Sequence, residues 1–447
     1  MTPLGLALLV ALPLVAGAAA AVLPRRAAHA TAGVTLALML LGAFVTRGAA
    51  PLAVGETELT LSSIGRLELG FIALVGLAML GYHYLAGRMA PLPALLPPLA
   101  ASIAAGTLFT RDLLVAASFL QLAALIAALL MIGEQPEWGA SLAGAIYLVL
   151  SALGGMALLF GFVLADVQRL SPGGLVTLQF VVAALTVGFA LQWGVAPLHA
   201  WLPNAFQRAG PASTALAISL LGPATLGLLL QALSVLPQLV ADERVNGFLT
   251  VGGLATAAFG AVAALAPSKP RRALGYLLVS DLGYVLVGMS TYSRIGVAGA
   301  ALHMAHRSVA ALLLLAAAHE LERDTLQSDE PAAPYSWAAL VLGVLALTGV
   351  PPLAGFAANW AVLQAASLVD WRLAVALSVT SGLALVGGLS AVGRMRTSYP
   401  LPWRAPRPVE RYLLALAALT ALWGLAPGPA LGAIHRAVSQ LAFVKSY

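Results

Sequence analysis

The sequence contains no cysteine, and only 9% of its 447 residues are charged. The absence of cysteine excludes disulfide bonds, thiolate zinc sites and cysteine-ligated iron–sulfur clusters within the chain. The scarcity of charge excludes an ordinary soluble domain, because a surface of this size needs more charged side chains for solvation. Hydrophobic residues make up 61% of the chain, a composition typical of a protein that lies in lipid.

Apolar segments of about 20 residues, each long enough to cross a bilayer, recur along the chain. They predict an all-α integral membrane protein with about fourteen transmembrane helices. The first segment lacks the positive leader of a signal peptide, so we expect it to be retained as a helix. The predicted spans are 3–23, 29–46, 66–87, 92–109, 113–132, 140–165, 174–196, 212–236, 247–266, 273–290, 296–319, 336–365, 372–393 and 410–427.

Proline interrupts two of these helices. Pro197 and Pro203 lie at the end of the seventh span, and Pro351 and Pro352 lie in the middle of the twelfth. Because proline frees carbonyls that lipid cannot satisfy, both breaks should face protein or a polar cavity. Breaks at matching places predict two inverted five-helix repeats. The predicted division is 1–91 for helices 1–3, 92–238 and 247–393 for the two repeats, and 394–447 for the last helix and tail.

The net charge of +6 does not indicate nucleic-acid binding, because the basic residues lie in loops between apolar spans. Most of them follow odd-numbered spans, and the positive-inside rule then places both termini on the non-cytoplasmic side. The lipid bilayer is the expected partner of the surface. The acidic stretch 320–330 is predicted to be a solvated loop or a docking segment for a soluble partner. The basic, proline-rich stretch 394–411 is predicted to be a loop that faces lipid headgroups.

Three stretches carry a family resemblance. Residues 196–205 read APLHAWLPNA, close to the signature PFHxWLPDA. Residues 271–284 contain RRALGY and SDLGY, similar to KRLLAYSSISHxGY, and residues 347–356 read LTGVPPLAGF, similar to LxGxPPxxGF. In these motifs and their order, the chain resembles the antiporter-like membrane subunits of complex I, Mrp antiporters and membrane-bound hydrogenases.

The resemblance implies a membrane subunit of a complex I-like energy-converting assembly of the NADH-quinone oxidoreductase type, associated with proton translocation. It implies other membrane subunits as partners and a location in the bacterial inner (plasma) membrane. It also implies a chain of lysines, a glutamate and histidines at mid-membrane depth, through which protons pass. In low dielectric, a neighbouring charge can load or unload such groups.

This sequence departs from the family at most of those relay positions. The relatives' glutamate of the fifth span is replaced by glutamine, and the lysines of four other spans are replaced by uncharged residues. Glutamine and asparagine form hydrogen bonds but do not titrate near neutral pH. The usual relay is therefore expected to be broken at Gln121, Gln192, Gly222, Ala311 and Asn359.

Five ionisable residues remain as candidates for a proton path or polar axis: His199, Asp281, His303, His306 and Arg307. The last three share one side of the eleventh helix, at positions i, i+3 and i+4. Asp281 and Arg307 should reach similar depth and form an ion pair, because an unpaired charge in hydrocarbon costs several kcal/mol. The cluster is interpreted as a packing network, a residual proton or ion path, or a contact with lipid headgroups or another subunit. His199 is either structural or proton-carrying.

No nucleophile–base pair or phosphate-cradling loop is present, so no catalytic centre, cofactor or metal is expected in this chain. A metal is disfavoured because no second carboxylate accompanies the histidines. Two functional hypotheses follow. The chain is either a translocating subunit of the assembly or a non-pumping scaffold that keeps the fold. A subunit of a cation antiporter or carbon-uptake complex is a further alternative.

Overall fold

The structure is a computed structural model that describes residues 4–45, 51–54, 57–87, 92–109, 112–134, 138–170, 177–266, 269–327, 334–398 and 407–445. It is helical almost throughout, with one two-stranded antiparallel hairpin. The strands β1 (Leu52–Val54) and β2 (Thr57–Leu59) pair in the connection between the second and third long helices. The prediction of a helical membrane protein is confirmed, and the hairpin was not foreseen, because strands of three residues are too short to show an alternating pattern.

The first half begins with three long helices, α1 (Leu4–Val22), α2 (Arg25–Val45) and α3 (Ser63–Leu85). Three more follow, α4 (Leu92–Leu108), α5 (Leu113–Glu134) and α6 (Trp138–Leu170). After α7 (Leu178–Trp193) and the short α8 (Trp201–Arg208), one rod is formed by α9 (Pro211–Leu216), a π-helical turn (Ala217–Leu221) and α10 (Gly222–Val235).

The second half begins with the short helices α11 (Pro237–Ala241) and α12 (Glu243–Gly247). A π-helical turn (Phe248–Gly252) continues α12 into α13 (Gly253–Leu265), followed by α14 (Pro270–Ser290) and α15 (Arg294–Gln327). The remaining helices are α16 (Pro334–Leu347), α17 (Ala354–Val369), α18 (Trp371–Ser398), α19 (Pro408–Leu425) and α20 (Gly428–Val438).

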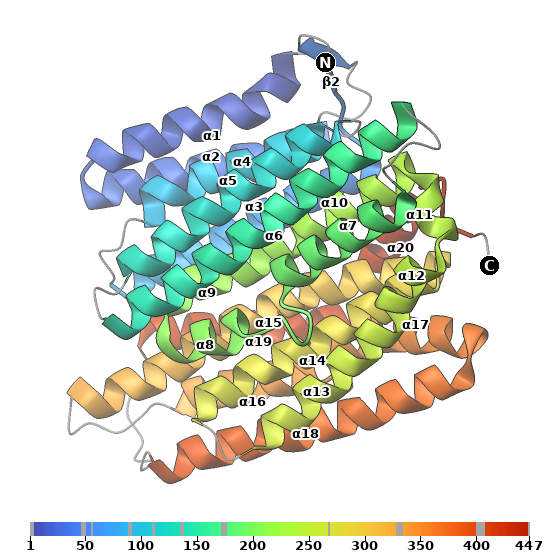
Figure 1. The fold of residues 1–447 in the computed structure, drawn as a ribbon. Coiled ribbons are helices and arrows are strands. Elements are labelled where there is room, and N and C mark those ends of the chain that lie inside the picture. The colour runs from blue at the N-terminus through green and yellow to red at the C-terminus, as the bar shows by residue number, and fades with distance from the viewer. Residues whose placement is uncertain are drawn as a thin grey trace.

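The chain is an integral membrane protein by its helices. Among the described residues, ten helices are long and apolar enough to cross a membrane, or eleven if α19 and α20, bent by 68° at a short break, form one span. Four shorter apolar helices, α4, α7, α16 and α17, lie among them. Figure 1 shows the long helices running roughly alongside one another.

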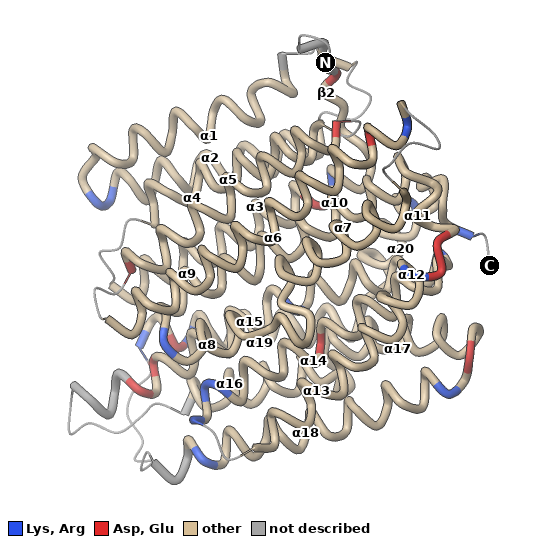
Figure 2. Tube along the Cα trace, in the orientation of Figure 1, with Lys and Arg blue, Asp and Glu red and all other residues tan. Residues whose placement is uncertain are grey.

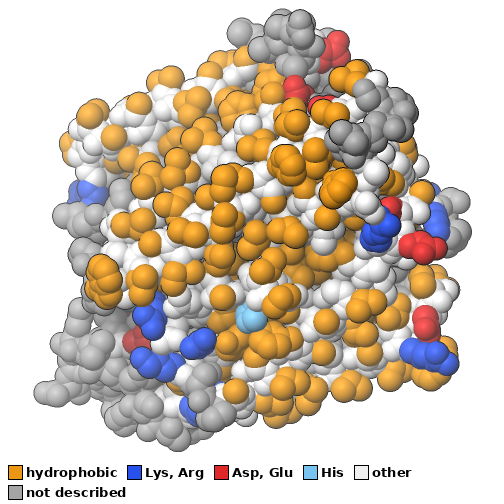
Figure 3. All heavy atoms as spheres, viewed as in Figure 1, with side chains coloured by type: hydrophobic (Ala, Val, Ile, Leu, Met, Phe, Trp, Pro, Cys, Tyr) orange, Lys and Arg blue, Asp and Glu red, His pale blue; other side chains and the backbone are white. Residues whose placement is uncertain are grey.

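The ends of the helix bundle differ from its middle in charge and in burial. Lys, Arg, Asp and Glu gather at the two ends of the helices (Figure 2), and hydrophobic side chains cover the middle of the face shown in Figure 3. The centre of the bundle lies around α14. In the apolar segment of this helix 94% of the residues are buried, whereas in that of the peripheral α1 33% are buried. Polar side chains in the middle of α14, such as Ser280 and Asp281, are therefore buried inside the protein.

Candidate functional site

A cluster of four ionisable side chains lies in the centre of the bundle, contributed by α14 and α15. Asp281 Oδ1 is 3.1 Å from His303 Nδ1 and 3.5 Å from His306 Nε2, and Asp281 Oδ2 is 3.6 Å from Arg307 Nη1. None of the four residues is more than 4% exposed. The expected ion pair between Asp281 and Arg307 is therefore present, and the two histidines share its carboxylate.

Helical spacing and packing place these side chains. Residues three and four apart project from the same side of a helix, and here His303, His306 and Arg307 all reach the carboxylate on the neighbouring helix. Arg307 also donates a hydrogen bond to the backbone carbonyl of Leu278, one turn before Asp281 on α14. The guanidinium thus neutralises the carboxylate while its own donor is satisfied, which is what a buried ion pair requires.

The imidazoles of His303 and His306 lie close to the same carboxylate oxygen, Oδ1 of Asp281. His303 Nδ1 lies 3.1 Å from Asp281 Oδ1 and also 3.1 Å from His306 Nε2. A neutral imidazole carries one proton, so a single proton can lie between these three atoms. His303 Nε2 and His306 Nδ1 are buried without a hydrogen-bond partner. The carboxylate and the two imidazoles therefore form one connected buried polar group.

The same three residues are compact enough to hold a metal ion. Their ligand atoms all lie within 4.8 Å of one another, and two histidines with a carboxylate form a common ligand set. Arg307 argues against a metal ion, because its guanidinium already supplies a positive charge 3.6 Å from the Asp281 carboxylate. A divalent cation at the same carboxylate would meet that charge in a buried site, so the arrangement fits an ion pair better than a metal centre.

The break between α16 and α17 lies beside the cluster. Pro351 and Pro352 fall in this break, and Gly355 in the next turn lies so close to His306 that an added Cβ would come within 3.2 Å of its Cε1 atom. The carbonyl of Thr348 accepts hydrogen bonds from Asn359 Nδ2 at 3.4 Å and from Ser381 Oγ of α18 at 2.7 Å. Groups freed by the break are thus satisfied by polar side chains, as lipid-excluded backbone requires.

Tyr284 connects the cluster to α18. Its ring stacks on His303 with centroids 5.4 Å apart. Its hydroxyl donates to the carbonyl of Leu377 at 2.5 Å and lies 3.0 Å from Thr380 Oγ1 on α18. The second half of the chain therefore holds a continuous polar region around the cluster and the helix break.

The break between α7 and α8 resembles the break between α16 and α17 in its backbone but has different side chains around it. α7 ends at Trp193 and α8 begins at Trp201, so Pro197 falls in the break, whereas Pro203 lies in the first turn of α8 rather than at the end of the preceding helix. Gln192 Nε2 donates to the carbonyl of Ser151 at 3.3 Å. Trp193 Nε1 donates to the carbonyl of Gly222 at 3.2 Å. These contacts are neutral hydrogen bonds.

Gln121 and Ala311 are also deeply packed. The side-chain amide of Gln121 lies against Gly155 on α6, where an added Cβ would come within 1.8 Å of its Cδ atom. Its Nε2 atom is buried without a partner. Ala311 is fully buried on α15, one turn after Arg307. Neither position offers a group that titrates near neutral pH.

The structure does not bring His199 to the central cluster. It lies in the break between α7 and α8, with its ring 4.4 Å from that of Phe259 and 6.0 Å from that of Tyr276. Its Nδ1 atom is buried without a hydrogen-bond partner. The histidine therefore packs between aromatic rings and makes no contact with the residues around Asp281.

Comparison with known proteins decides the family. The model described as "NADH:quinone oxidoreductase/Mrp antiporter, TM" matches residues 110–384, more than half of the chain. The chain belongs to this family. The resemblance drawn from the three motifs is thereby confirmed.

Curated relatives of this family align with part of the chain. An NAD(P)H-quinone oxidoreductase chain 4 from Synechococcus is 31% identical over 223 residues, which are 48% of this chain and 41% of that protein. A subunit of an Na⁺/H⁺ antiporter from Alkalihalophilus pseudofirmus is 27% identical over 213 residues, 46% of this chain and 43% of that protein. The alignments thus span less than half the length of these relatives.

Solved structures share the fold over nearly the whole chain. A chain of the Mrp complex from Dietzia superposes with a TM-score of 0.84 at 20% identity, covering 98% of this chain and 97% of its own. A chain of the membrane-bound sulfane sulfur reductase, an archaeal respiratory complex, gives 0.84 at 20% identity, with 98% and 99% covered. A chain of respiratory complex I from Thermus thermophilus gives 0.79 at 22% identity, with 99% and 100% covered.

Sequence reasoning missed a second buried charged network in this family member. Glu320 was expected in a solvated loop, and that expectation was wrong: it lies within α15 and is fully buried. Arg407, at the start of α19, contacts Glu320 Oε2 at 3.1 Å and Glu410 Oε1 at 3.1 Å, and Tyr82 donates to Glu320 Oε1 at 3.2 Å. The prediction of a headgroup-facing loop thus fails at Arg407, while residues 399–406 lie outside the described part of the chain.

Two further groups were also missed. His29 and His83 on α2 and α3 are buried, with Nε2 and Nδ1 3.2 Å apart. Glu68 lies inside the predicted third span, on α3. An acidic residue within an apolar span is by itself a functional signal, and applying that rule to every span would have found it.

Proposed function

We propose that this chain is a membrane subunit of an energy-converting assembly of the complex I or Mrp type, and that its capacity for proton transfer is concentrated in the second half. The observation that carries this proposal is the buried cluster of Asp281, His303, His306 and Arg307 beside the break between α16 and α17. An intramembrane ionisable group whose protonation can change responds to charge in a neighbouring subunit. The partners in this proposal are other membrane subunits.

The backbone at the two breaks supports an inverted-repeat architecture. After Trp193, Gly194 has φ 76° and Val195 donates to the carbonyl of Ala190, five residues back. After Leu347, Gly349 has φ 75° and Val350 donates in the same way to Leu345. Each helix thus ends in a left-handed glycine cap of the Schellman type.

Counting helices supports the same architecture. If α4, the two interrupted helices and the bent pair α19–α20 each cross once, the bundle has about fourteen crossings. The first five-helix repeat would then occupy 92–238 and the second 247–393, flanked by 1–91 and 394–447. Loop charges favour both termini on the non-cytoplasmic side of a bacterial inner membrane.

The test uses the whole assembly. The tagged chain is purified from its host with its co-purifying subunits, which are identified by mass spectrometry, and the complex is placed in lipid vesicles that contain a pH-sensitive dye. Asp281→Asn keeps the shape of the side chain and removes its charge, so we expect proton uptake to fall by at least about tenfold. Uptake equal to that of the unaltered complex would contradict the proposal.

A non-pumping scaffold is the second candidate, and a specific observation favours it. At the positions where relatives carry relay residues, Gln192 and Asn359 form neutral hydrogen bonds to backbone carbonyls. Such bonds hold helices together without moving charge. In a scaffold, Asp281→Asn would leave proton uptake unchanged while weakening retention of the neighbouring subunits, and the mass spectrum of the same preparation would show that loss.

A further inference from the structure

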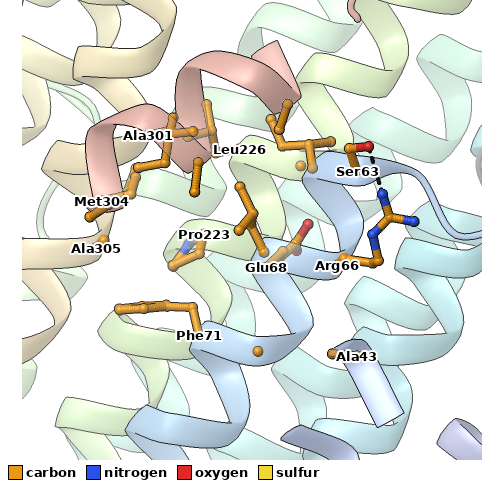
Figure 4. Close-up of a pocket in the computed structure, with 18 of the residues that line it drawn as sticks. Ala43, Ser63, Arg66, Glu68, Phe71, Pro223, Leu226, Ala301, Met304 and Ala305 are labelled. Atoms are coloured by element: carbon orange, nitrogen blue, oxygen red, sulfur yellow. Dashed lines mark hydrogen bonds between the residues drawn. The ribbon is translucent and has the colours of Figure 1, made fainter. Parts of the chain in front are cut away.

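A cavity of about 670 Å³ lies between α3, α10, α15 and α20 (Figure 4), and the four residues of the central cluster are not part of its lining. Its size is within the range of small-molecule sites. Most of its lining is apolar, with residues such as Phe71, Leu226 and Met304. Polar side chains at its wall are Ser63, Arg66, Glu68, Arg436 and Gln440.

Glu68 is the acidic residue of this wall, and it also borders a second, smaller pocket. That pocket lies between α3, α4, α5 and α10 and is lined by Thr107 and Gln231 as well as Glu68. Glu68 interacts with the Thr107 side chain, and Gln231 Oε1 is buried without a partner. The carboxyl group therefore lies between a large open cavity and a small polar one.

The packing around Glu68 leaves room for a carboxyl group. An added Cβ on Gly227 of α10 would come within 2.4 Å of Glu68 Oε2. The glycine thus lets α10 approach α3 at the carboxyl itself. A larger residue at this position would displace Glu68, so the space on α10 and the acidic side chain on α3 match one another.

Glu320 and Glu410, the buried glutamates of the network around Arg407, are paired with a cation, unlike Glu68. Glu320 and Glu410 each lie 3.1 Å from a nitrogen of Arg407. Over the ranges that the structure describes, no ion pair joins Glu68 to a basic side chain. An unpaired carboxylate in a membrane interior is costly, so the group needs either water or a proton.

We infer that this cavity is a water-accessible vestibule and that Glu68 at its wall takes up and releases protons. In uptake, a hydronium ion in the cavity transfers its proton to a carboxylate oxygen and leaves as water; release is the reverse. Leu120 of α5 lines the same small pocket, so the carboxyl lies beside the helix in which Gln121 stands where relatives carry glutamate. A role of Glu68 in translocation, through its position beside α5, rests on the proposed function; its exchange of protons with the cavity does not.

The experiment labels carboxyl groups on the full chain in lipid nanodiscs near neutral pH. Two carbodiimides are used: dicyclohexylcarbodiimide, which is lipid-soluble, and a water-soluble carbodiimide with glycine ethyl ester as the amine. Both react with protonated carboxyl groups, and peptide mass spectrometry locates the adduct. We expect both reagents to modify Glu68, with the signal absent in Glu68→Gln. Glu320 and Glu410 should stay unmodified, because both are buried and each is paired with Arg407.

Two variants test the geometry. Gly227→Ala should displace the carboxyl and lower labelling several-fold, whereas Gly432→Ala on α20, whose added Cβ meets no atom closer than 3.6 Å, should leave it unchanged. If Gly227→Ala does not fold, Ala433→Trp narrows the cavity from α20 and should lower labelling as well.

The outcomes separate this inference from the proposed function. Modification by the lipid-soluble reagent alone would overturn it, because the cavity would then hold lipid rather than water. Failure of both reagents to modify Glu68 would also overturn it. Normal labelling in a complex that shows no proton uptake would support the inference and contradict the proposed function.

Discussion

The two interrupted helices of this chain have similar backbones and different chemistry. Both end in a left-handed glycine, Gly194 and Gly349, followed by a residue that bonds five positions back. Around the first break, Gln192 and Trp193 make neutral hydrogen bonds. Beside the second break lies the cluster of Asp281 and its three cationic or titratable neighbours.

The difference shows that the break and the charge are independent features. A helix break in a membrane requires only that freed carbonyls find donors, and an uncharged amide is enough for that. Charge at the same depth requires pairing, and the second half supplies it through Arg307. The fold can therefore be kept at both breaks while buried charge is placed beside only one of them.

The largest expected effect is on the stability of the second half. Arg307→Ala leaves the Asp281 carboxylate buried without its cation, which should cost about 3–5 kcal/mol. Thermal unfolding in detergent, followed by circular dichroism, should show a clear fall in Tm. Arg244→Ala removes an exposed arginine and serves as the control. A fall no greater than that of the control would mean that the ion pair does not hold the cluster.

Replacing histidines compares the halves directly. The double change His303→Ala and His306→Ala removes both imidazoles that contact Asp281. It should lower proton uptake by the reconstituted assembly about 10²-fold, as loss of a positioned acid–base group does. His199→Ala in the first break should retain most of the uptake. Equal losses in the two variants would erase the distinction between the halves.

A packing change probes the first half. Gly155→Ala would place a Cβ 1.8 Å from Cδ of Gln121, whereas at Gly382 on α18 no atom lies within 4 Å of an added Cβ. Overpacking should cost about 1–3 kcal/mol in Gly155→Ala, and Gly382→Ala should unfold at nearly the unaltered temperature. Similar Tm values for the two variants would show that Gln121 can move aside.

The smallest effect is expected at the neutral hydrogen bonds. Gln192→Leu removes the bond to Ser151, and Asn359→Leu removes the bond to Thr348. Each should cost about 0.6 kcal/mol, the average for polar contacts between membrane helices. Thermal unfolding of both variants measures this cost. A loss several times larger at Gln192 alone would indicate that the first half depends on its polar contact for more than packing.

Much of the fold could be predicted because lipid imposes simple rules on sequence. The apolar segments predicted the long helices, and proline marked both interruptions. The depth and spacing of Asp281 and Arg307 also predicted their contact, because few partners exist for a charge in hydrocarbon. The hairpin of β1 and β2 was not predicted, since so short a pairing leaves no pattern.

The buried network around Glu320 and Arg407 could not be predicted from the sequence. Its members come from three helices that are distant in the chain, α3, α15 and α19. Each is polar and close to the end of an apolar span, where a solvated position is the usual outcome. Only packing brings the charges together and buries the two carboxylates.

The sequence by itself determined that the chain lies in a membrane and where its helices break, because these properties depend on local composition. The tertiary structure alone decided that His303, His306 and Arg307 all meet one carboxylate, that His199 stands apart, and that Glu68 borders a cavity. The physical reason is that a charge in low dielectric is governed by its nearest neighbours in space, and those neighbours come from other helices.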